Sequence, residues 1–190
     1  MALSFTEVFI LFVMLTILVM FIQNHFTEVD LVTSALDGNA YLVRRLKDSD
    51  AAADYLAMVN RKLTQLIWHM KAKYPDNRDV QRLYENYTPR NVSEGSIESG
   101  YTSYSVNKGE KLILCIRQRD RSFVDVNVML YVAIHELAHL MTSEIGHTPL
   151  FWDNFRFLLN EAIAQGLYTK KDYSADPQEY CGITIQSSVV

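Results

Sequence analysis

Two histidines and a glutamate lie close together in residues 131–141, a segment whose other side chains are almost all apolar. If the segment is helical, His135 and His139 lie on one face, one turn apart, because side chains four residues apart are neighbours on a helix. Two neutral imidazoles held in this way can bind one divalent cation, and zinc is the usual occupant of such a pair. Polar side chains in an apolar helix are costly unless something pairs with them, so we predict a metal site here.

Glu136 follows the first histidine and points about 100° further round the helix, so it is too offset to complete the metal shell. It can instead take a proton from a water activated by the metal and later pass that proton to a leaving amine. This is the division of roles in the H-E-x-x-H sequence of zinc peptidases. We therefore predict zinc-dependent hydrolysis of peptide bonds, with His135 and His139 as ligands and Glu136 as general base.

A catalytic zinc site needs a third protein ligand and an open position, and the sequence offers two candidates for that ligand. His147 follows Gly146, which is expected to end the helix, and a turn there can fold His147 back toward the metal. Pro149 then suits the first position of the next helix. Glu161, on that following helix, is the second candidate, and the residues alone leave both open.

The sequence His-Glu-Leu-Ala-His at 135–139, with His147 shortly before Phe151-Trp152, resembles the WLM and SprT-like metallopeptidases, small relatives of the gluzincins. In those families the third ligand is a histidine followed by a Phe or Phe-Trp pair. The resemblance therefore favours His147, and it implies that Glu161 lies behind the ligands or faces the substrate. Residues 160–163 also resemble the glutamate-bearing helix of thermolysin-type gluzincins, which keeps Glu161 as the competing assignment.

The whole chain also resembles uncharacterised metallopeptidase-like proteins encoded by giant DNA viruses of algae and protists. That likeness rests on short segments at 103–109, 134–139, 146–148 and 180–182. It implies a viral protein and carries little information about the substrate.

Composition limits the classes of partner. The formal net charge of −4 and the pI near 5.7 argue against a nucleic-acid partner, which would call for a basic surface. A SprT-type protease acting on DNA–protein crosslinks is thus an alternative that the charge disfavours. A non-catalytic membrane protein with a structural metal is a second alternative, but a structural site has no use for Glu136. We expect a peptide or protein substrate.

The N-terminal segment is the second informative feature. Residues 8–22 are apolar except for Thr16, and no charged residue lies between Glu7 and Glu28. Residues 8–22 as a helix would span about 22 Å, and extension over residues 5–26 approaches the roughly 30 Å hydrocarbon core of a bilayer. The lack of a basic start and of a small-residue cleavage site disfavours a signal peptide. We predict a single-pass anchor over 1–28, in a viral or host membrane, followed by a metallopeptidase domain over 29–190.

Periodicity and turn signals predict an α+β fold. Asp37-Gly38 separates two apolar-rich runs and predicts a hairpin over 29–46. Apolar stripes predict helices over 48–74, 79–87 and 149–166, and residues 180–185 have the pattern of a closing strand. We expect a zincin-like domain with about three main helices on a small, mostly antiparallel sheet, plus the N-terminal transmembrane helix. Asp125 or Ser122 is expected to cap the metal helix.

A second hairpin, over 101–116, shortly precedes the metal helix and turns at residues 107–110. An extended peptide substrate can add to such a strand as one more strand. Tyr101 and Tyr104 on this hairpin are candidates to donate a hydrogen bond to the oxyanion, or simply to pack across the strands. Cys115 and Cys181 form no metal-binding pattern, so we expect them to pack as small apolar side chains, with a disulfide as the alternative.

Overall fold

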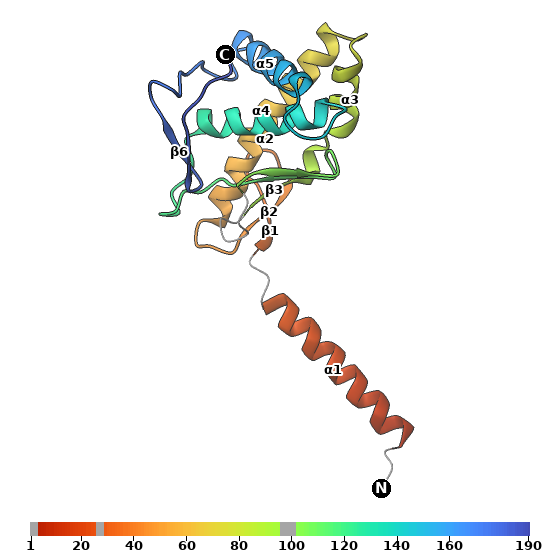
Figure 1. Cartoon of the computed structure of the whole chain (residues 1–190). Helices are drawn as coiled ribbons and strands as arrows, with labels where there is room; N and C mark the ends of the chain where they lie inside the picture. Colours follow the sequence, from red (N-terminus) through yellow and green to blue (C-terminus); the bar gives the residue numbers. More distant parts are fainter. Residues whose placement is uncertain (1–3, 26–28, 96–101) are drawn as a thin grey trace.

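The computed structural model of the chain describes residues 4–25, 29–95 and 102–190 (Figure 1). Its α-helices are α1 (Phe5–His25), α2 (Ser49–Lys73), α3 (Arg78–Asn86), α4 (Val126–Met141) and α5 (Pro149–Ala164). Its strands are β1 (Val29–Thr33), β2 (Ala40–Arg44), β3 (Val92–Glu94), β4 (Tyr104–Val106), β5 (Lys111–Leu114), β6 (Gln178–Tyr180) and β7 (Ile183–Ile185). The predicted α+β class is confirmed.

The main sheet has the strand order β1-β2-β3-β5-β4. Both predicted hairpins form, because β1 pairs with β2 and β4 pairs with β5 in antiparallel register. The sheet is mixed, however, so the expectation of a mostly antiparallel sheet holds only for the two hairpins. Strand β3 was not predicted, lies between the two hairpins and runs parallel to both of its neighbours. It covers only Val92–Glu94, which is too short for a periodic pattern to reveal it.

Helix α4 is the central element of the fold. It contacts α5, α3, α2 and strand β4, and it lies between the sheet and α5 (Figure 1). Met129, Ala133, Leu137 and Leu140 are fully buried along its length. At its start, the Asp125 carboxylate accepts hydrogen bonds from the backbone N–H groups of the first turn, which confirms one of the two predicted caps. A helix enclosed on so many sides can hold polar side chains in a defined place.

Helix α2 supplies most of the remaining core. Its apolar stripe is buried as the spacing predicts, and it packs against β1, β2 and β3. The short helix predicted at 79–87 is present as α3, and it joins the three main helices α2, α4 and α5 beside the sheet in residues 29–95 and 102–190.

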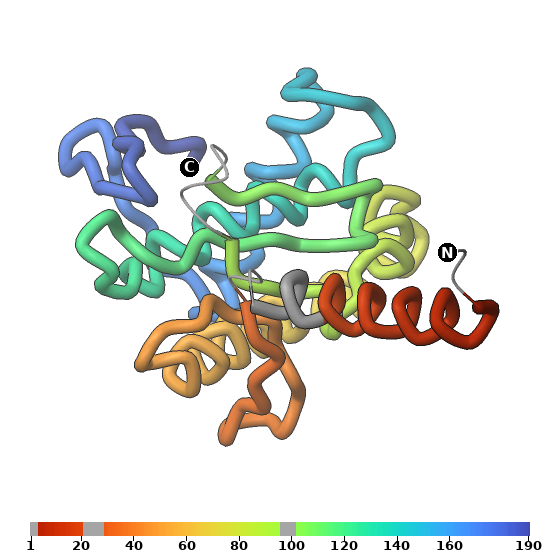
Figure 2. The backbone as a smooth tube through the Cα atoms, turned by 90° about the horizontal axis from the view of Figure 1, so that it is seen from below, coloured from red at the N-terminus to blue at the C-terminus, as the bar shows by residue number. Residues whose placement is uncertain are grey.

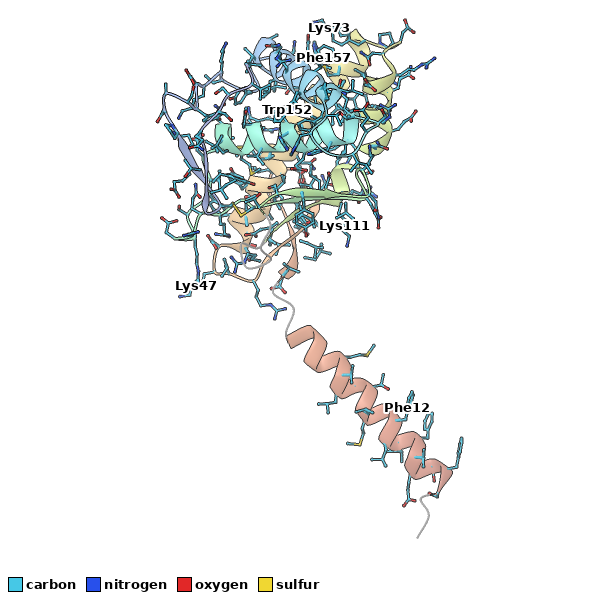
Figure 3. The ribbon with its side chains drawn as sticks, in the orientation of Figure 1. Phe12, Lys47, Lys73, Lys111, Trp152 and Phe157 are labelled. Atoms are coloured by element: carbon cyan, nitrogen blue, oxygen red, sulfur yellow. A yellow bond between two sulfur atoms is a disulfide. The ribbon has the colours of Figure 1, made fainter. Side chains whose placement is uncertain are left out.

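Helix α1 confirms that the apolar N-terminal run is helical. Figure 1 shows it projecting away from the sheet and the other helices, and its described apolar side chains, including Phe12 (Figure 3), are exposed. Within the described residues, no helix has both the length and the apolar character that crossing a membrane requires. The transmembrane part of the expected fold is therefore not supported, and the location of the chain stays a prediction.

The C-terminal segment differs from its prediction. Instead of one closing strand over residues 180–185, residues 178–185 form two strands, β6 and β7, which make an antiparallel hairpin of their own. The chain reverses at Cys181 and Gly182, which both have positive φ angles of 47° and 84°. Glycine adopts this left-handed conformation readily, and Gly182 therefore allows the tight turn.

A disulfide joins this hairpin to the main sheet. Cys181 in the β6–β7 turn is bonded to Cys115, which directly follows β5, with a Cα–Cα distance of 6.3 Å. The expected packing as separate thiols is thus wrong, and the disulfide alternative holds. The two cysteines are separated by 66 positions in sequence, so only the packing of the hairpin against β5 brings them together.

A buried ion pair holds the unpredicted strand β3. The Arg117 Nε donates to Glu94 Oε1 at 2.8 Å, and the two side chains are only 2% and 0% exposed. Glu94 also accepts the backbone N–H of Arg44 at 2.7 Å, and Arg117 Nη1 donates to Asp48 at 2.6 Å. One carboxylate therefore ties the ends of β2 and β3 to the segment after β5.

Replacing Arg117 with methionine is expected to destabilise the fold strongly, because the Glu94 carboxylate would remain buried without its counter-charge. The expected loss in the free energy of unfolding is about 3–5 kcal/mol, measured by urea denaturation. Arg45→Met is the matched control. The Arg45–Asp30 pair is 44% and 41% exposed, and breaking an exposed pair costs about 0–1 kcal/mol. Equal stability losses in the two variants would contradict the role given to the buried pair.

Candidate metal centre

Three histidines converge at one place. His135 and His139 lie one turn apart on α4, and His147 lies in the segment between α4 and α5. Ligand nitrogens of the three rings all lie within 4.8 Å of one another. The ring centroids are 5.0 Å apart for His135 and His139, and 4.9 Å from each of these to His147. The side chains thus form a nearly equilateral triangle around one point.

The position of His147 depends on where α4 ends. The prediction that Gly146 ends this helix is wrong, because α4 stops at Met141. Thr142 leaves the helix with an extended backbone, and its hydroxyl donates to the Ala138 carbonyl at 2.7 Å. Gly146 instead lies in the following loop with a φ of 86°. The loop ends at Thr148, which caps α5, and Pro149 occupies the first helical turn as predicted.

Helix α5 supports the three imidazoles from behind with aromatic rings. Phe151 is fully buried, and its ring centroid lies 4.8 Å from His135, 4.3 Å from His139 and 4.7 Å from His147. The ring centroid of Trp152, also on α5 (Figure 3), lies 5.4 Å from that of His147. These contacts limit the orientations available to the rings, and they explain why a Phe-Trp pair follows the third histidine.

The electrostatics of the cluster favour neutral imidazoles. Burial, aided by the neighbouring histidines, lowers the pKa of His135 to about 3. Burial likewise lowers the pKa of His139 to about 4, with His147 and Lys108 contributing in the same direction. Neutral imidazole is the form that binds a metal, so His135 and His139 could act as ligands at neutral pH.

The donor set fits a tetrahedral divalent cation. Two nitrogens that are each about 2.0–2.1 Å from one zinc ion would lie about 3.3 Å apart. The Nε2 atoms of His135 and His147 are 3.0 Å apart, close to that value. The three histidines could therefore hold one metal ion and leave a fourth position open.

Glu136 lies next to the histidines on α4 and is 6% exposed. Burial raises the pKa of its carboxyl group to about 7, although hydrogen bonding from Ser105 on β4 works in the opposite direction. A carboxylate with a pKa near neutrality can both accept and return a proton, which is the property of an efficient general base.

A cavity of about 830 Å³ lies over these residues. Its floor contains His135 and Glu136, and strand β4 with the preceding residues forms a polar wall. Ile145 from the α4–α5 loop and Ile183 and Ile185 from β7 form an apolar wall. The lining of this open cavity thus combines polar and apolar groups.

Glu161 does not reach the cluster of His135, His139 and His147. Its carboxylate accepts hydrogen bonds from Tyr74 at 2.7 Å and from Lys73 at 3.0 Å, and it pairs with His69 at 2.8 Å. Burial alone would raise its pKa, but these partners lower the pKa of Glu161 to about 2. Glu161 joins α5 to the end of α2, so the structure brings His147, and not Glu161, to the other two histidines.

The two tyrosine candidates have different outcomes. Tyr101 lies outside the described residues. Tyr104 lines the cavity from β4, where it pairs with Ile113, while Ser105 pairs with the buried Leu112. Since successive side chains of a strand point to opposite faces, Tyr104 and Ser105 lie on opposite faces of β4. The oxyanion role of Tyr104 stays a prediction.

Sequence reasoning missed Tyr180 as a residue of the site. It is 1% exposed, lines the cavity, and shares a hydrogen bond with the Ser103 hydroxyl. The one available signal was that residues 180–182 belong to the segments behind the likeness to giant-virus proteins. The pattern itself indicated only a strand.

The chain is similar in sequence to viral proteins that are described as uncharacterized. No protein-family model matches the chain. It is 31% identical over 169 residues to uncharacterized protein R325 of Acanthamoeba polyphaga mimivirus, covering 86% of each chain. It is 36% identical over 83 residues to uncharacterized protein 136R of Invertebrate iridescent virus 6, covering 42% of this chain and 46% of the relative.

Among solved structures, the fold is similar to that of Wss1 from Saccharomyces cerevisiae. The TM-score is 0.50, and the match covers 66% of this chain and 90% of Wss1 at 17% sequence identity. A mutant of Wss1 gives the same TM-score and covers 92% of that chain. Likeness at this level of identity shows a shared fold.

His147→Ala is expected to weaken metal binding, because it removes one of three ligands. Loss of a residue that only supports a ligand typically costs 10- to 100-fold in affinity, so loss of a ligand is expected to cost more than about 100-fold. Competition with a coloured zinc chelator measures this change. Glu161→Gln is the control and is expected to leave the affinity unchanged. An unchanged affinity in His147→Ala, or a comparable loss in Glu161→Gln, would refute the ligand assignment.

Proposed function

This chain belongs to the family of the uncharacterized mimivirus protein R325, and we propose that its activity is zinc-dependent hydrolysis of peptide bonds. The observation that carries the proposal is the triangle of three imidazoles beside a buried carboxylate, at the floor of an open cavity. The resemblance of residues 135–152 to WLM and SprT-like metallopeptidases and the fold shared with Wss1 support the same reading.

Zinc is the metal that this donor set suits best. Imidazole nitrogens are borderline ligands, and three of them with an open fourth position is an arrangement of catalytic zinc sites. A zinc ion held by His135, His139 and His147 would polarise a substrate carbonyl as a Lewis acid and make water more acidic.

Glu136 would carry the proton in this reaction. Its carboxylate adjoins the first histidine and faces the same cavity, so it is placed to accept a proton from the attacking water. The proton then passes to the leaving amine, which would otherwise be expelled as an unstable anion. The enclosed position that raises its pKa to about 7 suits both transfers.

Strand β4 offers a binding edge for the substrate. It is the last strand of the main sheet, paired with β5 on one side, and it lines the cavity that holds Glu136. An extended peptide can add to such an edge through backbone hydrogen bonds, which bring its peptide groups across the site. These bonds do not depend on the side chains of the peptide.

The apolar part of the cavity lining would then select side chains. Ile145 and Ile183 are 91% and 50% exposed, and with Ile185 they give this part of the lining its apolar character. When a large apolar side chain of the substrate packs against these isoleucines, the apolar surfaces of both are removed from water. We expect peptides with a bulky apolar residue near the scissile bond to be preferred.

Glu136→Gln is expected to bind zinc as the parent does and to lose most of its activity. Removing a general base typically lowers turnover by about a hundred- to ten-thousandfold. Metal analysis and cleavage of an unfolded protein such as casein give the two measurements. Glu179→Gln, at an exposed carboxylate on β6, is the matched control and should cleave normally. Full activity in Glu136→Gln would remove the base assignment, and zinc binding without any cleavage by the parent would favour a structural metal.

Ile183→Asp is expected to reduce the preference for bulky apolar residues. Full burial of one such side chain contributes about 1.5–3 kcal/mol, so kcat/KM for a leucine-containing peptide should fall by about ten- to a hundredfold relative to its serine counterpart. A library of unfolded peptides analysed by mass spectrometry measures the preference. An unchanged ratio between the two peptides would mean that the apolar wall does not select the substrate.

A further inference from the structure

The C-terminal end of α4 has an unusual set of hydrogen-bond partners. The last carbonyl groups of any helix lack partners within it and must be satisfied from elsewhere. Here, side chains from another helix do this. Asn86 donates to the Leu140 carbonyl at 3.0 Å, and Arg82 donates to the Met141 carbonyl at 2.8 Å. Both side chains come from α3, so α3 fixes the end of the metal helix.

Lys108 continues this series past the end of the helix. Its Nζ donates to the carbonyl oxygens of Thr142 at 2.6 Å, Ser143 at 2.8 Å and Glu144 at 3.0 Å. A lysine ammonium has three donors, and all three are used on consecutive peptide groups. One side chain thus holds the first part of the loop that leads to His147.

The turn that carries Lys108 is itself held in place. Lys108 and Gly109 connect β4 to β5 with positive φ angles of 55° and 117°. A Cβ atom at Gly109 would lie 2.0 Å from the Asn86 carbonyl oxygen, so only glycine allows this close approach to α3. Figure 2 shows the β4–β5 turn beside α3. The ammonium of Lys108 therefore projects from a fixed point of the sheet.

The loop held by Lys108 needs such support. Residues 143–147 are exposed and belong to no helix or strand. Within the described part of the chain, the hydrogen bonds recorded for the backbone of this loop come from Lys108. When an exposed loop must become ordered on ligand binding, the entropy lost in ordering it lowers the affinity of the protein for the ligand. A loop that is already ordered avoids this loss.

We propose that Lys108 is a positioning residue for the metal site, which acts by placing His147 before the metal arrives. The inference rests on the proposed function, since it takes His147 as the third ligand. Its consequence is that the hairpin bearing the substrate edge and the loop bearing the third ligand form one unit. Strand β4 and His147 are then kept at a constant separation across the cavity.

The test is the zinc affinity of Lys108→Met in the full chain, measured by competition with a coloured chelator. Loss of a group that orients a metal ligand typically costs about 10- to 100-fold in affinity, and we expect a loss in this range. Lys108→Arg should retain most of the affinity, because the guanidinium also offers several donors. Lys73→Met is the matched control. Lys73 likewise makes more than one hydrogen bond, but to Glu161, and its loss should leave the zinc affinity unchanged.

A double-mutant cycle with His147→Ala separates positioning from general stability. If Lys108 acts through His147, then Lys108→Met should have no further effect on zinc affinity once His147 is alanine. An unchanged affinity in Lys108→Met alone, or the same loss with and without His147, would overturn the proposal. Should Lys108→Met fail to fold without zinc, as judged by circular dichroism, Lys108→Gln enters the same cycle.

The cycle also distinguishes this inference from the proposed function. If His147→Ala weakens zinc binding and Lys108→Met does not, only the role of Lys108 is refuted. If His147→Ala leaves the affinity unchanged, the three-histidine site itself is refuted.

Discussion

Three imidazoles must converge on one point, and the rest of the structure depends on this arrangement. Burial removes the water that would stabilise a charged imidazole, which is why the pKa values of His135 and His139 fall far below their usual range. The enclosure of α4 by other helices and the sheet creates that environment, and Phe151 contacts all three rings. The same enclosure raises the pKa of Glu136, so one physical cause prepares both the ligands and the base.

His147, the proposed third ligand, differs from the other two histidines because it is exposed and belongs to a loop. Its position is not secured by burial. It is secured by how α4 ends: Thr142 leaves the helix, side chains from α3 and the β4–β5 turn bind the free carbonyl groups, and Thr148 starts the next helix. At this exposed edge of the site, charged and polar side chains thus add to the packing of Phe151 and Trp152 against the His147 ring.

The walls of the cavity come from elements far apart in the sequence. Strand β4 contributes polar groups to the lining, and the β6–β7 hairpin supplies Tyr180 and two isoleucines. The Cys115–Cys181 disulfide joins this small hairpin to the end of β5. A two-stranded hairpin is only marginally stable alone, so the covalent link and the Tyr180–Ser103 hydrogen bond give the wall a defined position. The fold therefore places this cavity next to the three histidines.

The sequence by itself determined the parts that depend on local spacing. The four-residue separation of His135 and His139, the helix around them, the Asp125 cap and both hairpin turns follow from periodicity and turn chemistry within short segments. Tertiary structure decided the rest. Whether His147 or Glu161 completes the site depends on Thr142 ending α4 early and on α2 engaging Glu161 through Lys73 and Tyr74. Strand β3, the disulfide and the three bonds of Lys108 join residues distant in sequence, and no local pattern encodes them, because such contacts exist only once the separate segments have packed together.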